Sequence, residues 1–137
     1  MPDIADCISF LTSAAAKAIN RLARERLAPH GITPAQYAVM RGLYEKGGQT
    51  GAEISASLVI DSATLTGVLD RLERAGYLAR KADRDDRRIN RLELTANGLA
   101  LMPALDAAID SVNEEADRRL RDQAEAIREA LKRLARE

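Results

Sequence analysis

The chain has 137 residues, of which 46% are hydrophobic, so it is long enough to bury one compact core and too apolar to be disordered. Aromatic residues make up 3% and tryptophan is absent, which leaves few stacking surfaces for single-stranded nucleic acid. The net charge is zero, and the one cysteine, Cys7, excludes a disulfide within the chain.

The N-terminal part is predicted to contain two helices. Apolar residues at helical spacing predict the first from about Ile4 to Leu27, with Pro29 ending it. Thr33 and Gln36 have the pattern of a capping box, in which two side chains bond the first backbone amides of a helix. They open the second helix, which the glycine pair at 47–48 closes.

Two shorter helices are predicted next, separated by about three residues. Thr50 and Glu53 form another capping pattern, which starts a helix that ends near Leu58. Asp61 caps the following helix, which runs to Ala75. Two short helices at this separation are the helix-turn-helix arrangement.

A charged hairpin follows these helices. Tyr77–Ala82 and Ile89–Leu94 are predicted strands, joined by the arginine-rich loop Asp83–Arg88. Residues 71–92 contain eight basic and four acidic residues, so this segment is basic in a chain that is neutral overall. A helix-turn-helix followed by a basic hairpin, or wing, predicts binding to a polyanion, for which duplex DNA is the natural partner.

The C-terminal part is predicted to be helical and to mediate self-association. Thr95 caps a long helix, and Asp122 with Glu125 looks like a further capping pair. The apolar stripe that continues to Leu134 is too long for one small domain to cover, so we predict pairing with a second copy. A two-fold dimer places its recognition helices about 34 Å apart, matching a palindromic site. A monomer whose helices fold back over the core is the alternative.

These elements together predict a mainly α fold with a small β-wing. We expect residues 1–32 to form an N-terminal helix of the dimerisation region, 33–95 the DNA-binding lobe, and 96–137 the C-terminal dimerisation helices. No signal peptide or apolar run of membrane-spanning length is visible, so we expect a cytoplasmic protein without a membrane partner.

The helix after Asp61 is the candidate recognition helix. Its outward face is small and polar near the N-terminus, as close approach to base edges requires. A glycine inside a helix costs about 1 kcal/mol relative to alanine, and approach to DNA is one reason to tolerate it. The alternative is an ordinary amphipathic helix with a solvated face. The expected DNA contacts in this region are Thr50, Ser62, Ala63, Thr64, Thr66, Gly67 and Arg71.

The wing supplies a second set of candidate contacts. Arg88 is the candidate for entering the minor groove, where narrow A·T-rich segments concentrate negative potential. Asp86 is placed to support it through a charge-assisted hydrogen bond. Arg84 and Arg87 are expected to contact phosphates. The alternative is a solvated turn with scattered ion pairs, each of which contributes little.

No pattern in the sequence indicates catalysis, a cofactor or a metal. A glycine-rich phosphate loop, a nucleophile elbow and a paired-carboxylate pattern are all missing. His30 has no partner at metal-ligand spacing, and arginines interleave the aspartates of the wing. Cys7 is either a redox sensor at the start of the first helix or, more commonly for such a residue, a small core side chain.

In these features the chain resembles the MarR family of winged-helix regulators. Two positions differ from the family pattern: Ser55 stands where a small apolar residue is usual, and Gly67 stands where many members have a larger side chain. The strongest match is to the family's wing pattern, through Asp83, Asp86, Arg87, Arg88, Leu94, Thr95 and Gly98. Residues 27–37 are similar to the junction between its first two helices, and Thr64, residues 69–73 and Gly76 are similar to its recognition helix.

The resemblance implies a homodimer that binds palindromic operator DNA, usually as a repressor, and that a small aromatic or lipophilic effector releases. It places the effector crevice between the DNA-binding lobe and the dimer helices. By position alone, and equally plausible as core, the candidate lining residues are Leu11, Tyr37, Met40, Tyr44 and Met102.

Two alternatives to an effector-released repressor remain. One branch of the family senses organic hydroperoxides through a cysteine in the first helix, which invites comparison with Cys7. Cys7 lies about two residues further from Thr33 than in that branch, and Pro34 replaces the branch's partner tyrosine. The second alternative is a winged-helix protein-interaction module that does not bind DNA.

Overall fold

A computed structural model describes residues 3–136, so residues 1, 2 and 137 of the predicted terminal regions lie outside the described residues. The strands form one antiparallel sheet, in which the third strand of the chain lies between the first and the second. The elements in chain order are α1 (Ile8–Leu27), α2 (Pro34–Glu45), β1 (Gln49–Thr50), α3 (Gly51–Leu58), α4 (Ser62–Arg74), β2 (Leu78–Ala82), β3 (Asn90–Leu94), α5 (Ala96–Leu120) and α6 (Ala124–Leu134), with 3-10 turns at Ile4–Asp6, Ala28–His30 and Arg121–Gln123.

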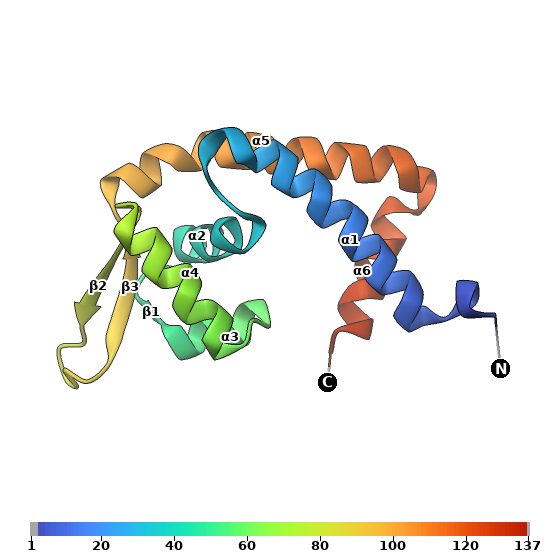
Figure 1. The fold of residues 1–137 in the computed structure, drawn as a ribbon. Helices are drawn as coiled ribbons and strands as arrows, with labels where there is room; N and C mark the ends of the chain where they lie inside the picture. Colours follow the sequence, from blue (N-terminus) through green and yellow to red (C-terminus); the bar gives the residue numbers. More distant parts are fainter. Residues whose placement is uncertain (1–2, 137) are drawn as a thin grey trace.

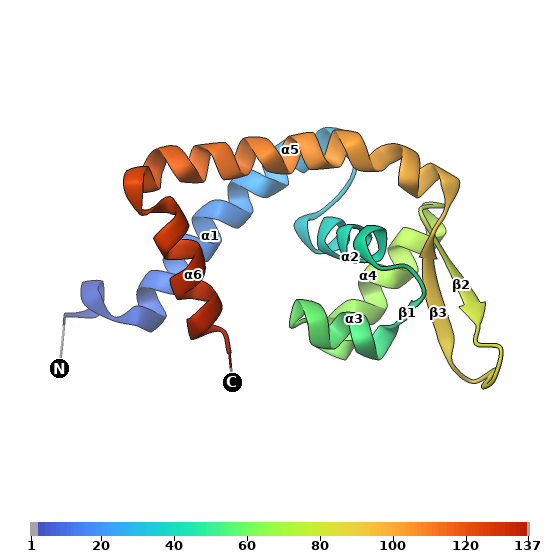
Figure 2. The same cartoon turned by 180° about the vertical axis from the view of Figure 1, so that it is seen from behind.

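The predicted mainly helical fold with a small β-wing is confirmed. Figures 1 and 2 show α2, α3, α4 and the sheet as one lobe below one end of the long helix α5. Helices α1 and α6 lie toward the other end of α5, where both ends of the chain are also found. None of the single helices among residues 3–136 is long and apolar enough to cross a membrane; α3 and α4 reach that length and composition only together, bent by 116°.

Local capping explains where the helices of the lobe begin. The Thr33 hydroxyl accepts from the Gln36 amide, and the Gln36 side chain accepts from the Thr33 amide, as predicted. Thr50 and Glu53 make the same pair of bonds at the start of α3. Asp61 caps α4 by accepting from the Thr64 amide. Each helix therefore starts where its own first-turn side chains satisfy the free amides.

The prediction that the first helix starts at Ile4 is wrong. Asp3 caps a separate 3-10 turn over Ile4–Asp6, with its carboxylate accepting from the Ala5 amide at 3.1 Å. Cys7 is extended, with φ −74° and ψ 123°, and becomes the N-cap residue of α1 without a side-chain capping bond. The extended residue interrupts the helical hydrogen bonds and so divides the predicted helix.

The prediction that Asp122 caps the last helix is also wrong. Asp122 lies inside the 3-10 turn at Arg121–Gln123, and Gln123 at the N-cap position of α6 has helical angles and no side-chain bond. A capping side chain needs an extended residue at this position. The change of direction from α5 to α6 occurs instead at Arg121, where φ is 56°.

The sheet contains one strand that the sequence did not predict. Strand β1 pairs with β3 through Gln49 opposite Leu92 and Thr50 opposite Arg91. The predicted strands are confirmed, but each begins one residue later, at Leu78 and Asn90. Two residues are too few for an alternating pattern, so β1 leaves no sequence signal.

One hydrophobic core joins the lobe to α5. Met102 and Leu105 of α5 are fully buried against it, which fixes this end of the long helix to the lobe. Its buried members are Leu27, Ile32, Val39, Met40, Leu43, Ile54, Leu65, Val68, Leu69, Leu72, Leu78, Leu92, Met102 and Leu105. Far from this core, α6 contains no buried residue.

Candidate nucleic-acid interface

Helix α4 is anchored by one face and exposes the other. Its buried residues are Leu65, Val68, Leu69 and Leu72. The predicted contact residues of the opposite side and its flanks are exposed, apart from half-buried Gly67: Ser62, Ala63, Thr64, Thr66 and Arg71. The predicted recognition residues therefore share one accessible surface on a helix that the core holds in place.

Hydrogen bonds within α4 orient two of these side chains. The Thr64 hydroxyl donates to Asp61 Oδ2 at 2.8 Å. The Thr66 hydroxyl donates to the backbone carbonyl of Ser62, also at 2.8 Å. Within residues 3–136 the Ser62 hydroxyl has no hydrogen-bond partner. The capping bonds from Thr64, first the amide and then the hydroxyl, hold the pKa of Asp61 below its usual value.

Packing within the fold does not require the glycine at position 67. A Cβ built there meets only Arg71 Nη1, at 3.9 Å.

At the start of α3, Thr50 is half-buried, and its hydroxyl oxygen accepts from the Glu53 amide at 3.2 Å. That bond leaves the Thr50 O–H available to donate to a phosphate.

Asp83 organises the base of the wing tip. Its amide donates to the Ile89 carbonyl at 2.8 Å, which closes the loop. One carboxylate oxygen accepts from the amides of Asp85 and Asp86, both at 3.0 Å, and the other accepts from Arg91 Nε at 2.6 Å. The bond from Arg91, followed by those from the two amides, holds the pKa of Asp83 below its usual value.

Arg88 is held in an outward position by Asp86. Its Nε and Nη2 donate to the two carboxylate oxygens at 3.0 and 3.1 Å, and its amide donates to Asp86 Oδ1 at 3.1 Å. The predicted hydrogen bond is therefore present, and the Arg88 side chain is still 91% exposed. The side-chain bond is the main cause that lowers the pKa of Asp86 and raises the pKa of Arg88.

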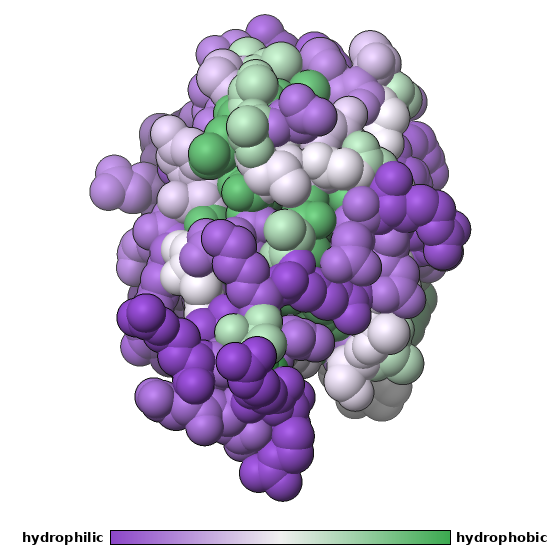
Figure 3. All heavy atoms as spheres, turned by 90° about the vertical axis from the view of Figure 1, so that its left-hand side faces the viewer, coloured by the Kyte–Doolittle hydropathy of each residue, from purple (hydrophilic) through white to green (hydrophobic). Residues whose placement is uncertain are grey.

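The tip also carries free positive charge. Arg84 and Arg87 are exposed, and neither forms an ion pair within residues 3–136. Figure 3 views the molecule from the wing side and shows hydrophilic side chains over the lower part of this face. The wing tip and the N-terminal end of α4 both point toward the bottom of Figure 1.

Sequence reasoning missed two arginines that hold the wing in place. Arg80 on β2 reaches α4, where Nη2 donates to Asp70 Oδ1 at 2.6 Å and Nε lies 3.7 Å from Glu73 Oε2. Arg91 Nη1 donates to the Gly48 carbonyl at 3.0 Å and so ties β3 to the residue before β1. From the sequence alone, both residues could be identified only as basic residues. Their partners depend on the angle between the helix and the sheet, which the sequence does not show.

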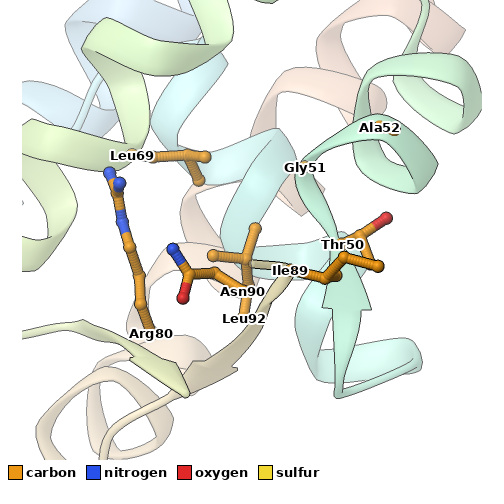
Figure 4. A pocket seen from close by; sticks show the side chains of 8 residues that line it. All are labelled: Thr50, Gly51, Ala52, Leu69, Arg80, Ile89, Asn90 and Leu92. Carbon is orange, nitrogen blue, oxygen red and sulfur yellow. The ribbon is translucent and has the colours of Figure 1, made fainter. Parts of the chain in front are cut away.

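A hollow of about 380 Å³ lies between α4, the start of α3 and the sheet. Arg80 extends across it from the sheet toward Leu69 of α4 (Figure 4). The remaining lining residues are Thr50, Gly51, Ala52, Ile89, Asn90 and Leu92. Its lining comes from α3, α4 and the sheet and includes none of the predicted effector residues.

The five candidate effector residues differ in how deeply they are buried. Met40 and Met102 are fully buried core residues, whereas Leu11 and Tyr44 are exposed. Tyr37 is half-buried, and its hydroxyl donates to Asp106 Oδ1 at 2.8 Å. Burial and this bond raise the pKa of Tyr37. Among residues 3–136, no group of three or more His, Cys, Asp or Glu side chains is placed to hold a metal ion.

Comparison with known proteins identifies the family. Residues 32–89 match the MarR family. The chain is 40% identical over 99 residues to the HTH-type transcriptional regulator TtmR of Methylorubrum extorquens, an alignment that covers 72% of this chain and 51% of TtmR. A probable transcriptional regulator from Pseudomonas aeruginosa has a similar solved structure, with 32% identity, a TM-score of 0.89, and coverage of 96% of this chain and 99% of that one.

The transcriptional repressor CouR of Rhodococcus jostii is similar over the full length. Its complex with a 23-mer DNA duplex superposes with a TM-score of 0.87, with 26% identity and 99% of each chain covered. Another CouR structure, 24% identical to this chain, is bound to p-coumaroyl-CoA. The relatives named here are transcriptional regulators rather than enzymes. With its helix-turn-helix and wing, the chain belongs to the MarR family of winged helix-turn-helix transcriptional regulators.

Proposed function

We propose that this protein is a ligand-responsive repressor that binds palindromic duplex DNA as a homodimer. The observation that carries the proposal is the pairing of α4 with the wing. Helix α4 exposes a surface of small polar side chains, and Arg88 is held outward by Asp86 at the wing tip. Because the N-terminal end of α4 and the wing tip point to the same side in Figure 1, one duplex can meet them together.

In this proposal the two elements read different grooves. The α4 surface that carries Ser62, Ala63, Thr64, Thr66 and Gly67 enters the major groove, where base pairs differ in donors and acceptors. Arg88 enters the minor groove. Arg71, Arg84, Arg87 and Thr50 contact phosphates, which position the protein without specifying sequence.

Uncovered apolar side chains support the homodimer. Ile8 and Leu11 of α1 and Leu131 and Leu134 of α6 are exposed, and α6 buries none of its residues. Helix α6 has no buried residue, which supports pairing with a second copy over a monomer whose C-terminal helices fold back over the core. A second copy supplies a matching apolar surface with two-fold symmetry, which also presents two copies of α4 to a palindromic site.

Release by a ligand fits the connection between the lobe and α5. Tyr37 and Arg41 of α2 both bond Asp106 of α5, with Arg41 Nη1 at 3.0 Å from Asp106 Oδ2. A small aromatic or lipophilic ligand that favours another lobe position would change the spacing of the recognition helices. By thermodynamic reciprocity, such a ligand must lower the affinity for DNA. CouR, which is similar in fold, has structures with DNA and with p-coumaroyl-CoA.

The test is fluorescence anisotropy with DNA from upstream of the protein's own gene, with excess random duplex and varied salt. We expect tight binding that survives the competitor and weakens steeply as salt rises. Binding that random duplex abolishes would contradict a specific operator in that fragment. If the protein binds other proteins and salt does not weaken that binding, the interaction-module alternative is favoured. If peroxide treatment abolishes DNA binding of the wild type but not of Cys7→Ser, redox sensing is favoured.

A further inference from the structure

Two hydroxyls on the outward surface of α4, those of Thr64 and Thr66, already donate their protons within the helix. A hydroxyl has one proton to donate and lone pairs to accept with. The Thr66 proton already goes to the Ser62 carbonyl, and the Thr64 proton goes to Asp61. Both side chains therefore present acceptors, but no free donor, to a molecule that approaches from outside.

The residue one turn beyond Thr66 has the same character. Asp70 follows Thr66 by four positions, so the two lie on the same face of the helix. Its side chain is 50% exposed, and its carboxylate can only accept hydrogen bonds. Ala63, three positions before Thr66 on this face, contributes no polar side chain, and Ser62, four positions before it, has a hydroxyl that is separate from Thr66.

Gly67 also leaves Thr66 accessible. A Cβ at this position would meet nothing closer than Arg71 Nη1 at 3.9 Å, so the fold leaves the space beside Thr66 open. A base edge can therefore come closer to the Thr66 hydroxyl than a larger neighbouring side chain would allow.

We infer that Thr66 is a specificity-determining residue that selects a base with an amino group on its major-groove edge. Resting on the proposed function, this inference adds which chemistry the helix reads. Adenine N6 and cytosine N4 are donors in the major groove, whereas guanine O6 and thymine O4 are acceptors. An acceptor-only Thr66 pairs with the first two bases. Facing a keto oxygen, its hydroxyl must first give up its hydrogen bond to the Ser62 carbonyl.

The expected discrimination is modest, because it corresponds to about one net hydrogen bond. We expect adenine or cytosine to be preferred over guanine or thymine on the facing strand by about two- to tenfold in affinity. The neighbouring positions of the site should depend on other residues.

The experiment selects binding sites from random duplexes with the wild-type protein and with Thr66→Val, which keeps the shape but lacks the oxygen. Affinities for single-base variants of the selected site follow. Thr66→Ser, which keeps the hydroxyl, should retain the preference. Thr12→Val is the matched control, because the Thr12 hydroxyl also donates to the carbonyl four residues earlier, at 2.8 Å, but lies on α1, outside the proposed DNA-contact surface. Thermal unfolding of each variant shows that the exposed substitutions leave the fold intact.

The inference is supported if Thr66→Val removes the preference at one position and the wild type selects adenine or cytosine there. It is overturned if no position changes, or if the position that changes carries guanine or thymine. A wild-type protein that enriches no sequence contradicts the proposed DNA reading itself, which distinguishes the two failures.

Discussion

Arg80 Nη2 lies 2.6 Å from Asp70 Oδ1, and this ion pair connects β2 of the wing to the recognition helix α4. The hollow beside it leaves part of the helix–sheet boundary without packed side chains (Figure 4). The Nε atom of Arg80 is buried without a hydrogen-bond partner within residues 3–136, although Glu73 lies nearby. The position of the wing relative to α4 therefore depends on this side chain more than an ordinary surface pair would suggest.

Arg80→Met should weaken operator binding while the protein remains folded. The pair is partly exposed, so its loss should lower the free energy of unfolding by about 1 kcal/mol or less. Operator affinity should fall more, because the wing and α4 no longer meet the duplex at a fixed spacing. The check is anisotropy beside urea unfolding. If the double variant Arg80→Asp with Asp70→Arg restores operator affinity, the ion pair acts by positioning the wing relative to α4. If Arg80→Met lowers the free energy of unfolding and the free energy of binding equally, this role is contradicted.

The helix starts could be predicted because their causes are local. Thr33, Thr50 and Asp61 each bond an amide within the first turn that follows, so a few neighbouring letters contain the whole signal. The Arg88–Asp86 contact is equally local. Ser55, which differs from the family pattern, also acts locally: its hydroxyl donates to the Ile60 carbonyl and so supports the turn between α3 and α4.

Features that depend on distant contacts could not be predicted in this way. Strand β1 exists because Gln49 pairs with Leu92, and Gln49 is buried, donating to the Lys46 carbonyl at 2.7 Å. The partner of Arg80 is set by the angle at which α4 crosses the sheet. The bend at Arg121 could not be predicted either, because its positive φ occurs at a residue other than glycine.

Two glycines should respond in opposite ways to alanine. A Cβ at Gly98 would overlap the Tyr77 carbonyl oxygen, so Gly98→Ala should lower the free energy of unfolding by about 1–3 kcal/mol. Gly67→Ala should raise it by about 1 kcal/mol, because its Cβ is unobstructed and alanine favours helix. The same Gly67→Ala should weaken operator binding by occupying the space beside Thr66. Urea unfolding and anisotropy separate the effects, and unchanged affinity would argue against close approach of DNA.

The wing aspartates should titrate below their usual range. Folding lowers the pKa of Asp83 and Asp86, so their ionised carboxylates add to the free energy of unfolding. This stabilisation is present above the usual aspartate pKa near 3.9 and is lost as the pH falls through the lower pKa values of the folded protein. The wing network should therefore be intact from pH 5 to pH 8. In carboxyl NMR titrations, Arg91→Met should return the pKa of Asp83 toward normal, and Arg88→Met that of Asp86. If each variant shifted the pKa values of Asp83 and Asp86 alike, the two arginine–aspartate pairs would not be independent.

Val59 should be a site where stability is easily gained. It is 84% exposed and adopts φ 54° and ψ 48°, a left-handed conformation that a β-branched residue rarely takes. Asparagine tolerates this conformation, so Val59→Asn should raise the free energy of unfolding by up to about 1 kcal/mol. Val59→Ala removes the β-branch but has no polar side chain to hydrogen-bond locally, so it should gain less. Thermal unfolding decides, and a lower midpoint for Val59→Asn would show that the exposed valine has a stabilising contact.

Charge on the exposed face of α6 should prevent dimerisation. Leu131 and Leu134 are 47% and 57% exposed in the single chain, so Leu131→Glu with Leu134→Glu should leave the monomer folded. Sedimentation velocity should then show a monomer that binds the operator weakly. Leu99→Glu is the control, since this leucine is also exposed but lies at the start of α5. A double variant that remains dimeric would place the interface elsewhere.

The most direct test of the central claim is a hydroxyl-radical footprint, with methylation protection of guanine N7, on the selected operator. We expect two protected segments related by two-fold symmetry, each with a protected major groove and an adjacent protected minor groove. Arg88→Ala should remove the minor-groove protection and leave the major-groove protection in place. A footprint without two-fold symmetry, or one that Arg88→Ala leaves unchanged, would contradict the assignment of α4 and the wing to the two grooves.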